Sequence, residues 1–222
     1  MTVIKLFHAP GACSRVTMNA LEEAGAVFED VMVNILAGDQ KKPEYIAINP
    51  KGKVPAIVID GQLVTENAAI LILIDRLFPD ARLLPPATAQ IAAAQTISDL
   101  LWCASGLHPL VRSIRMPSRL TSGDEASVRA KGVEQLAIQA APIDMRLSRQ
   151  PWYYGEAWAI MDVYIHWMFT TAAAGGFDLA PYPNIQDHAR RVRARESFQR
   201  ALAREMAALE RAGVRLPPGV SL

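Results

Sequence analysis

Cys13 is the side chain with the clearest chemical potential in this chain of 222 residues. It follows a short apolar run over 3–7 and the loop Ala-Pro-Gly-Ala, and it stands at the start of a helix predicted over 14–24. The helix dipole and the first-turn amides favour a thiolate in this position. Such a thiol has two uses: it stabilises the thiolate of a bound thiol, or it attacks a disulfide and holds a mixed disulfide. The alternative is a small buried apolar side chain.

The second chemical feature is the pair Val54-Pro55, which lies between a turn cluster over 49–53 and a short β-branched run over 56–59. Proline cannot donate to a sheet ladder, so Pro55 is predicted to stand where a strand begins. The backbone of Val54 can then pair with a ligand, and a cis Val54–Pro55 bond would turn its amide and carbonyl outward. This segment therefore predicts an edge that binds an extended peptide.

Glu66 and Asn67 follow about ten residues later, where the apolar spacing changes from strand-like to helix-like. A helix start attracts a carboxylate because its first amides point outward. Glu66 can accept from an ammonium, and Asn67 can cap the helix and hold a carboxylate through its amide. The alternative is an ordinary helix N-cap. Together with the Val54 edge, these residues predict a pocket for a small peptide that bears a carboxylate and an amine.

These segments resemble the cytosolic glutathione transferases. The run over 49–67 resembles their glutathione-binding half, and residues 6–14 are similar to the first strand and loop of the bacterial beta class, whose cysteine contacts the glutathione sulfur. The resemblance covers nearly the whole chain. It implies glutathione as co-substrate along Val54, with its γ-glutamyl end at Glu66 and Asn67 and its sulfur near Cys13. Asn67 departs from the usual serine of the family.

Four further residues gain a role only through this resemblance. Lys53 and Lys41 are expected to reach the glycine carboxylate of glutathione as point charges, and a solvated surface lysine is the alternative for each. His108 matches a beta-class histidine that reaches the bound thiol from the second domain, where a neutral imidazole accepts a proton or donates to sulfur. The alternative is a core histidine. Ser14 is a second candidate for the thiol contact, because some related transferases use a neighbouring hydroxyl.

The elements that must position these residues read β-α-β-α-β-β-α up to about residue 79. This order implies parallel pairing of the first strands, an antiparallel hairpin across Asp60-Gly61 and helices on both faces of the sheet. Residues 80–87 have the composition of a linker, and beyond them the apolar residues recur at helical spacing. We predict a thioredoxin-like α/β domain over 1–79 and an all-α domain over 88–222 that contributes the second-substrate site, which is the glutathione transferase fold.

Composition excludes several classes of protein. Hydrophobic residues make up 51% and charged residues 20%, which is typical of a globular chain, and a net charge of +1 gives no general attraction to nucleic acid or membrane. No apolar run reaches the roughly 18 residues that a membrane span needs. The two cysteines lack C-x-x-C spacing and the histidines lack metal-ligand spacing, so we expect a reducing cytoplasm, no disulfide and no metal.

The start of a later helix carries one departure from the family pattern. Residues 155–162 resemble a buried helix start at which serine or threonine caps the helix and an aspartate three residues on completes the capping box. Ala159 stands in the capping position and cannot accept a hydrogen bond, so a stability loss of about 1 kcal/mol is expected unless another group substitutes. Asp162 is structural in this interpretation.

The resemblance implies a cytoplasmic two-fold homodimer that conjugates the glutathione thiolate to small hydrophobic electrophiles, a detoxification reaction. Two alternatives stay open. One is a glutathione-dependent thiol–disulfide oxidoreductase that forms a mixed disulfide at Cys13. The other is a non-catalytic protein that uses the same fold to bind a partner.

Overall fold

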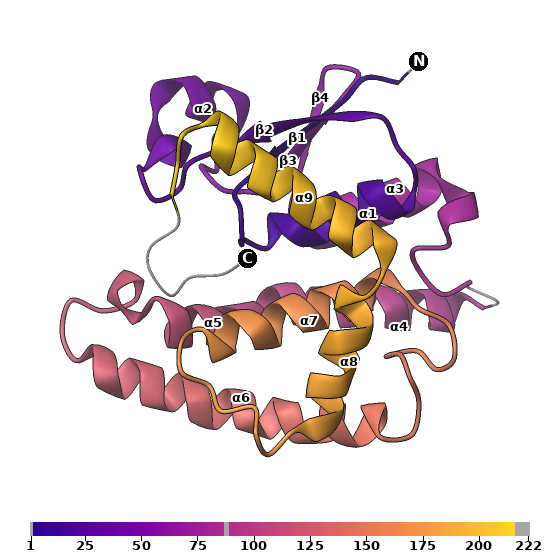
Figure 1. Ribbon diagram of the computed structural model, residues 1–222, viewed down its shortest axis with the longest axis vertical. Helices are drawn as coiled ribbons and strands as arrows, with labels where there is room; N and C mark the ends of the chain where they lie inside the picture. Colours follow the sequence, from indigo (N-terminus) through magenta and orange to yellow (C-terminus); the bar gives the residue numbers. More distant parts are fainter. Residues whose placement is uncertain (1, 87–88, 216–222) are drawn as a thin grey trace. The chain divides into compact units, whose positions relative to one another are not determined.

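The computed structural model describes residues 2–86 and 89–215, and its elements confirm a thioredoxin-like sheet domain followed by helices (Figure 1). The described chain forms two compact units. The first contains the chain up to Leu83 together with the residues from Arg195 onward, and the second runs from Leu84 to Ala194.

The first unit is built on a four-stranded sheet with the order β2-β1-β3-β4. Its elements are β1 (Ile4–His8), α1 (Ser14–Glu23), β2 (Phe28–Met32), the 3-10 turn η1 (Asp39–Lys41), α2 (Pro43–Ile48), β3 (Ala56–Ile59), β4 (Gln62–Thr65), α3 (Asn67–Leu77), the 3-10 turn η2 (Pro79–Ala81) and α9 (Glu196–Arg211). Strands β1 and β2 are parallel, and β3 is antiparallel to β1 and β4. The predicted hairpin turn is confirmed, because Asp60 and Gly61 both have positive φ, at 49° and 82°.

Side chains of the sheet alternate between two helical layers. Phe7 packs edge-on against Tyr45 of α2, with ring centroids 5.8 Å apart. Its neighbour Leu6 points to the opposite face and is fully buried, and α1 packs against β1. The expectation of helices on both faces is therefore confirmed, and the end of β1 is held firmly where the loop to α1 begins.

Helix α9 packs against α1 and β2 in the first unit, so the helices that follow residue 88 are divided between the two units. Arg200 and Arg204 both pair with Glu22 of α1, which explains this placement. Figure 1 shows α9 running beside α1. Apolar spacing predicts that a helix forms here but does not specify what it packs against. The expected domain start at residue 88 and the residues 216–222 lie outside the described residues.

The second unit is helical. Its elements are α4 (Gln90–Leu101), the π-helical segment η3 (Trp102–Leu107), α5 (His108–Arg115), the 3-10 turn η4 (Pro117–Arg119), α6 (Glu125–Leu147), α7 (Ile160–Ala173) and α8 (Pro183–Arg193). The π-helical segment η3 separates α4 from α5. Gly106 permits this, since a Cβ added there would lie 2.9 Å from Cδ1 of Trp102.

Asp162 organises the start of α7. It is fully buried, and its Oδ2 accepts from the Ala159 amide at 2.9 Å. Its Oδ1 accepts from the Tyr153 amide at 2.7 Å and lies 2.8 Å from Nε2 of His188. One half of the predicted capping box is thus present, and the contacts to Tyr153 and His188 add bonds that the sequence pattern did not indicate.

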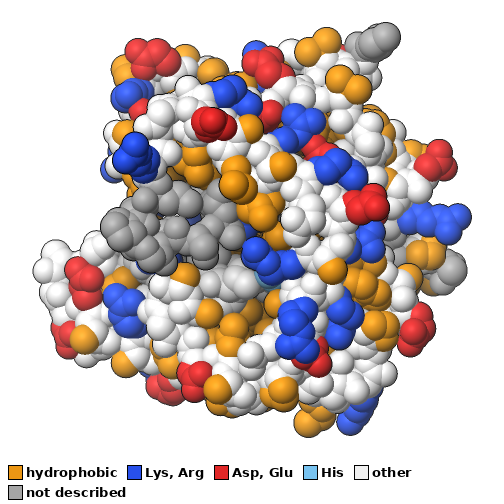
Figure 2. Space-filling model, viewed as in Figure 1, with side chains coloured by type: hydrophobic (Ala, Val, Ile, Leu, Met, Phe, Trp, Pro, Cys, Tyr) orange, Lys and Arg blue, Asp and Glu red, His pale blue; other side chains and the backbone are white. Residues whose placement is uncertain are grey.

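Acidic, basic and apolar side chains are interspersed over the face of the molecule drawn in Figure 2. The basic run over 188–195 is not a uniform solvated face. His188 is buried against Asp162, and Arg191 donates to the Pro151 carbonyl at 3.0 Å. Its cations therefore serve partly to tie loops and helices together.

Among the described helices, none combines the length and apolar character that crossing a bilayer requires. Within residues 2–86 and 89–215, no cluster of three or more His, Cys, Asp or Glu side chains is arranged to hold a metal ion.

Candidate functional site

The site starts at the loop between β1 and α1. The Ser14 hydroxyl accepts from the Ala9 amide at 3.0 Å and donates to the Ala9 carbonyl at 3.2 Å, which closes the loop locally. Cys13 becomes the N-cap residue of α1, at the helix start that the sequence predicted. Cys13 and Ser14 are both buried, and the Ser14 hydroxyl is already bonded to Ala9. Which of the two faces a bound thiol stays a prediction.

Cys13 faces the Val54 edge. Its Sγ lies 3.6 Å from the Val54 carbonyl oxygen, to which the thiol can donate. The Val54–Pro55 bond is cis, which confirms the isomer that the sequence allowed. The pairing of β3 with its neighbours begins at Ala56, so the Val54 amide and carbonyl stand outside the ladder. The structure thus brings Cys13 to the predicted peptide-binding edge.

Two hydrogen bonds fix the chain just before this edge. The Lys53 carbonyl accepts from the Tyr45 hydroxyl at 2.7 Å and from Nδ2 of Asn49 at 2.7 Å. Burial raises the pKa of Tyr45, so its phenol remains a donor at neutral pH. Lys53 therefore serves through its backbone as part of the scaffold, while its side chain is exposed beside the edge.

Asn67 contacts the thiol segment in a way that the sequence did not predict. Its Nδ2 donates to the Cys13 carbonyl at 3.0 Å, and its Oδ1 accepts from the Thr17 hydroxyl at 2.7 Å. The Asn67 amide is buried and each of its ends already bonds within the protein, so its role toward a ligand carboxylate stays a prediction. A carboxylate would instead meet backbone amides of the first turn of α3, which the Glu66 side chain does not cap.

Glu66 lies at the turn between β4 and α3. It is one of three non-glycine residues described with positive φ, here 72°, a strained conformation that clusters at functional sites. Its side chain is 60% exposed, and its carboxylate lies 3.1 Å from Nζ of Lys51, which also donates to the Thr65 hydroxyl at 2.9 Å. The carboxylate and the ammonium therefore stand together at the surface beside the start of α3.

Lys51 was missed by the sequence reasoning, which named Lys53 instead. The two lysines flank Gly52, whose φ of 58° and close approach to the Gln40 carbonyl define the turn. Which lysine reaches Glu66 depends on that turn. The sequence does show a glycine between two lysines, Lys51 and Lys53, which is a signal for a turn with a cation on each side. That signal does not tell which of the two lysines reaches Glu66.

Two further predicted residues, Lys41 and His108, lie on other elements. Lys41 lies on η1 with an exposed side chain. His108 opens α5 in the second unit, where its half-buried ring packs edge-on against Trp167 with centroids 4.8 Å apart. The roles of Lys41 and His108 in glutathione chemistry stay predictions.

The second cysteine is structural by its surroundings. Cys103 is fully buried in the second unit, and its Sγ lies 3.7 Å from Sδ of Met161. Burial raises the pKa of the Cys103 thiol, so it stays protonated and unreactive. No disulfide joins Cys13 and Cys103 in the structure.

The chain is similar to known proteins over most of its length. The family model for the glutathione S-transferase N-terminal domain matches residues 2–76. The chain is 31% identical to glutathione S-transferase GstA of Escherichia coli O157:H7, over 91% of this chain and 98% of that protein.

Solved structures give the same result over nearly the full length. A bacterial beta class glutathione S-transferase of Sphingomonas chungbukensis matches with a TM-score of 0.79 and 33% identity, covering 90% of this chain and 98% of that one. A sphingomonad glutathione S-transferase complexed with glutathione matches with a TM-score of 0.79 and 31% identity, covering 91% of this chain and 98% of that one.

A relative with a different name is also similar in sequence. The disulfide-bond oxidoreductase YfcG of Escherichia coli K12 is 27% identical over 94% of this chain and 99% of that protein.

Proposed function

The chain belongs to the glutathione S-transferase family, and on that premise we propose that it conjugates the thiol of glutathione to small hydrophobic electrophiles. The observation that carries the proposal is the 3.6 Å approach of the Cys13 Sγ to the Val54 carbonyl. A thiol at a helix start and an unpaired sheet edge meet at this point. The sphingomonad relative with bound glutathione supports the choice of ligand.

In this proposal glutathione lies in extended form along Val54. Its cysteinyl amide and carbonyl pair with the Val54 backbone, and its γ-glutamyl carboxylate meets the first-turn amides of α3. The γ-glutamyl ammonium pairs with the exposed carboxylate of Glu66. Lys53 and Lys41 supply cations for the glycine carboxylate, and Lys51, which stands beside Glu66, would exchange that pairing for the γ-glutamyl carboxylate.

The chemistry needs only modest help from the protein. The glutathione thiol loses its proton, the Cys13 S–H donates to the resulting thiolate, and the thiolate forms a carbon–sulfur bond as the leaving group departs with its electron pair. His108 is proposed to accept or donate a proton at the sulfur, as the family resemblance suggests. The two-fold homodimer, the cytoplasmic location and the role in detoxification are proposals on the same basis.

A second reaction is favoured by the position of Cys13 at the start of α1 and by the similarity to YfcG. The Cys13 thiolate would attack the glutathione sulfur of a disulfide between glutathione and another thiol, form a Cys13–glutathione disulfide and release the other thiol as its thiolate. A second glutathione would then attack this mixed disulfide, which returns Cys13 to the thiolate and yields oxidised glutathione.

Two assays separate these reactions. We expect measurable conjugation of glutathione to chlorodinitrobenzene and slower reduction of hydroxyethyl disulfide. Disulfide reduction without conjugation would favour the oxidoreductase. Loss of both, with no retention on immobilised glutathione, would leave the non-catalytic binding protein as the remaining alternative and refute the proposed transferase.

A further inference from the structure

Glu205 of α9 connects the C-terminal helix to the segment that carries Cys13. Its side chain is fully buried. Its Oε1 accepts from the Gly11 amide at 3.2 Å, and its Oε2 accepts from Nε of Arg15 at 2.8 Å. Gly11 and Arg15 lie on either side of Cys13 in the sequence. One carboxylate from the end of the chain therefore holds the thiol segment both before and after its reactive residue.

Stability alone is a weak explanation for this contact. Replacement of a buried ion pair by apolar residues of similar volume is often neutral or stabilising, because desolvation offsets the attraction between the charges. Burial raises the pKa of Glu205, while the Arg15 guanidinium and the Gly11 amide act in the opposite direction. An apolar residue could fill the same space, but it could not accept the Gly11 hydrogen bond. The carboxylate therefore orients the Gly11 amide through a hydrogen bond, which an apolar side chain of the same volume could not do.

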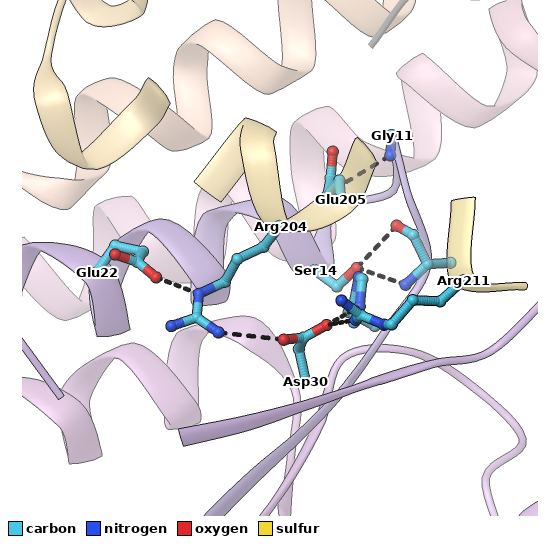
Figure 3. A network of polar contacts seen from close by, with 9 residues as sticks. Gly11, Ser14, Glu22, Asp30, Arg204, Glu205 and Arg211 are labelled. Atoms are coloured by element: carbon cyan, nitrogen blue, oxygen red, sulfur yellow. Dashed lines mark hydrogen bonds and ion pairs between the residues drawn. The ribbon is translucent and has the colours of Figure 1, made fainter. Parts of the chain in front are cut away.

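The Gly11 amide is the point at which α9 reaches the loop. Gly11 has a φ of 75°, a left-handed conformation that glycine adopts without steric cost. Figure 3 shows its amide directed at Glu205. Other bonds of the loop come from the loop itself, such as Ala12 to Ala9, and from α3, where Asn67 donates to the Cys13 carbonyl. Asn67 and Glu205 therefore hold the segment from two different helices.

Helix α9 is fixed where Glu205 can reach the loop. Arg204, the preceding residue, pairs with Glu22 of α1 and lies 3.1 Å from Asp30 of β2. Arg211 lies 2.6 Å from the other oxygen of Asp30. Figure 3 shows Arg204 and Arg211 both directed at the Asp30 carboxylate. These pairs set the position of α9 along α1 and β2, independently of the contact to the loop.

We propose that Glu205 is a positioning residue: its hydrogen bond to the Gly11 amide sets the place of the Cys13 thiol relative to the Val54 edge. This inference rests on the proposed glutathione function. Glu205 does not touch the ligand, and it acts through the backbone of the thiol segment. Its loss should therefore alter thiol placement even in a protein that stays fully folded.

Two variants separate positioning from stability. The double variant Arg15→Met/Glu205→Leu removes the charges and the Gly11 acceptor together but fills the space. The variant Glu205→Gln keeps an amide oxygen for Gly11 but leaves the Arg15 charge without its counterion. Arg211→Gln on the same helix is the matched control, because it loses an ion pair without touching the thiol segment.

The measurements are the thermal midpoint, amide hydrogen exchange of residues 11–13, the rate of Cys13 alkylation by iodoacetamide, and kcat and KM for conjugation. We expect the double variant to keep its thermal midpoint, to exchange and alkylate at least about tenfold faster, and to lose about a hundredfold in kcat/KM with a fall in kcat. Glu205→Gln should show a lowered thermal midpoint with exchange and alkylation close to those of the control.

Two results would overturn the positioning role. In the first, amide exchange of residues 11–13 speeds up only in the variants whose thermal midpoint falls. In the second, the double variant exchanges its amides and is alkylated at the same rates as Arg211→Gln. If the double variant does not fold, Glu205→Asp replaces it. This variant keeps the charge, but its side chain is too short to hold Gly11 and Arg15 together, so its exchange and alkylation should again be faster than those of Arg211→Gln. Exchange and alkylation need no ligand. The wild-type protein could fail to bind glutathione while the variants still show the expected exchange and alkylation rates. That result would refute the proposed function but not the positioning of the loop.

Discussion

Replacement of Cys13 by alanine should lower kcat/KM for conjugation by about a hundredfold and abolish disulfide reduction completely. The first loss follows because one preorganised hydrogen-bond donor to a developing or resident anion contributes about two orders of magnitude in rate. The second follows because no other described thiol stands at this edge, and the buried Cys103 stays protonated. Steady-state kinetics with chlorodinitrobenzene and with hydroxyethyl disulfide measure both.

Cys13→Ser is the informative companion variant. Its hydroxyl keeps a donor, so conjugation should fall less than in Cys13→Ala, whereas disulfide reduction should again disappear because serine forms no mixed disulfide. Ser14 should not rescue either variant, because its hydroxyl is buried and closes the loop at Ala9. Unchanged conjugation in Cys13→Ala would contradict a contact between Cys13 and the bound thiol.

Replacement of Asp162 by alanine should destabilise the protein by about 3 to 5 kcal/mol, the range for breaking a buried, hydrogen-bonded charge network. The change removes the acceptor of the Tyr153 and Ala159 amides and the partner of His188, all of them buried. Each donor would lose its bond in a place that water does not reach. Urea denaturation followed by circular dichroism gives the free energy of unfolding.

Asp124→Ala is the matched control for this experiment. Asp124 also caps a helix, accepting from the Ser127 amide at 3.1 Å, but it is exposed at the start of α6. Its replacement should lower the free energy of unfolding by only about 1 kcal/mol. If Asp162→Ala lost no more than this control, the network around Asp162 would not be the anchor of α7 that the structure indicates.

The sequence predicted the fold well because its signals were local. Pro55 at a strand start, the Asp60-Gly61 turn and the change of apolar period at Glu66 each act within a few residues, and all three features stand where they were expected. The packing of α9 was not predictable in the same way. It depends on pairs such as Arg204 with Glu22, whose members are nearly the whole chain apart.

The site was predicted in part for the same reason. The sequence identified Cys13 and the Val54 edge from their own surroundings, but it did not indicate that the Asn67 side chain bonds to Thr17 and to the Cys13 carbonyl. Contacts of this kind depend on how α1 and α3 face each other across the loop. Lys51 and Glu205 were missed likewise, because only the tertiary fold brings them to Glu66 and Gly11.

The capping position at Ala159 illustrates a compensation that sequence patterns do not reveal. Alanine supplies no acceptor, and the isolated pattern suggests a weakened helix start. In the structure, Asp162 accepts from two amides and contacts His188, so the start of α7 is held by a network that extends to α8.

The central claim is that the Val54 edge and the start of α3 bind glutathione, and titration calorimetry tests it most directly. We expect a heat of binding with one site per chain and a dissociation constant between about 1 μM and 1 mM, in the range where enzymes of this kind meet their substrates. Glu66→Gln should bind about tenfold more weakly, since it loses one charge-assisted contact to the γ-glutamyl ammonium. Absence of any binding heat with the wild-type protein at millimolar glutathione would contradict the account.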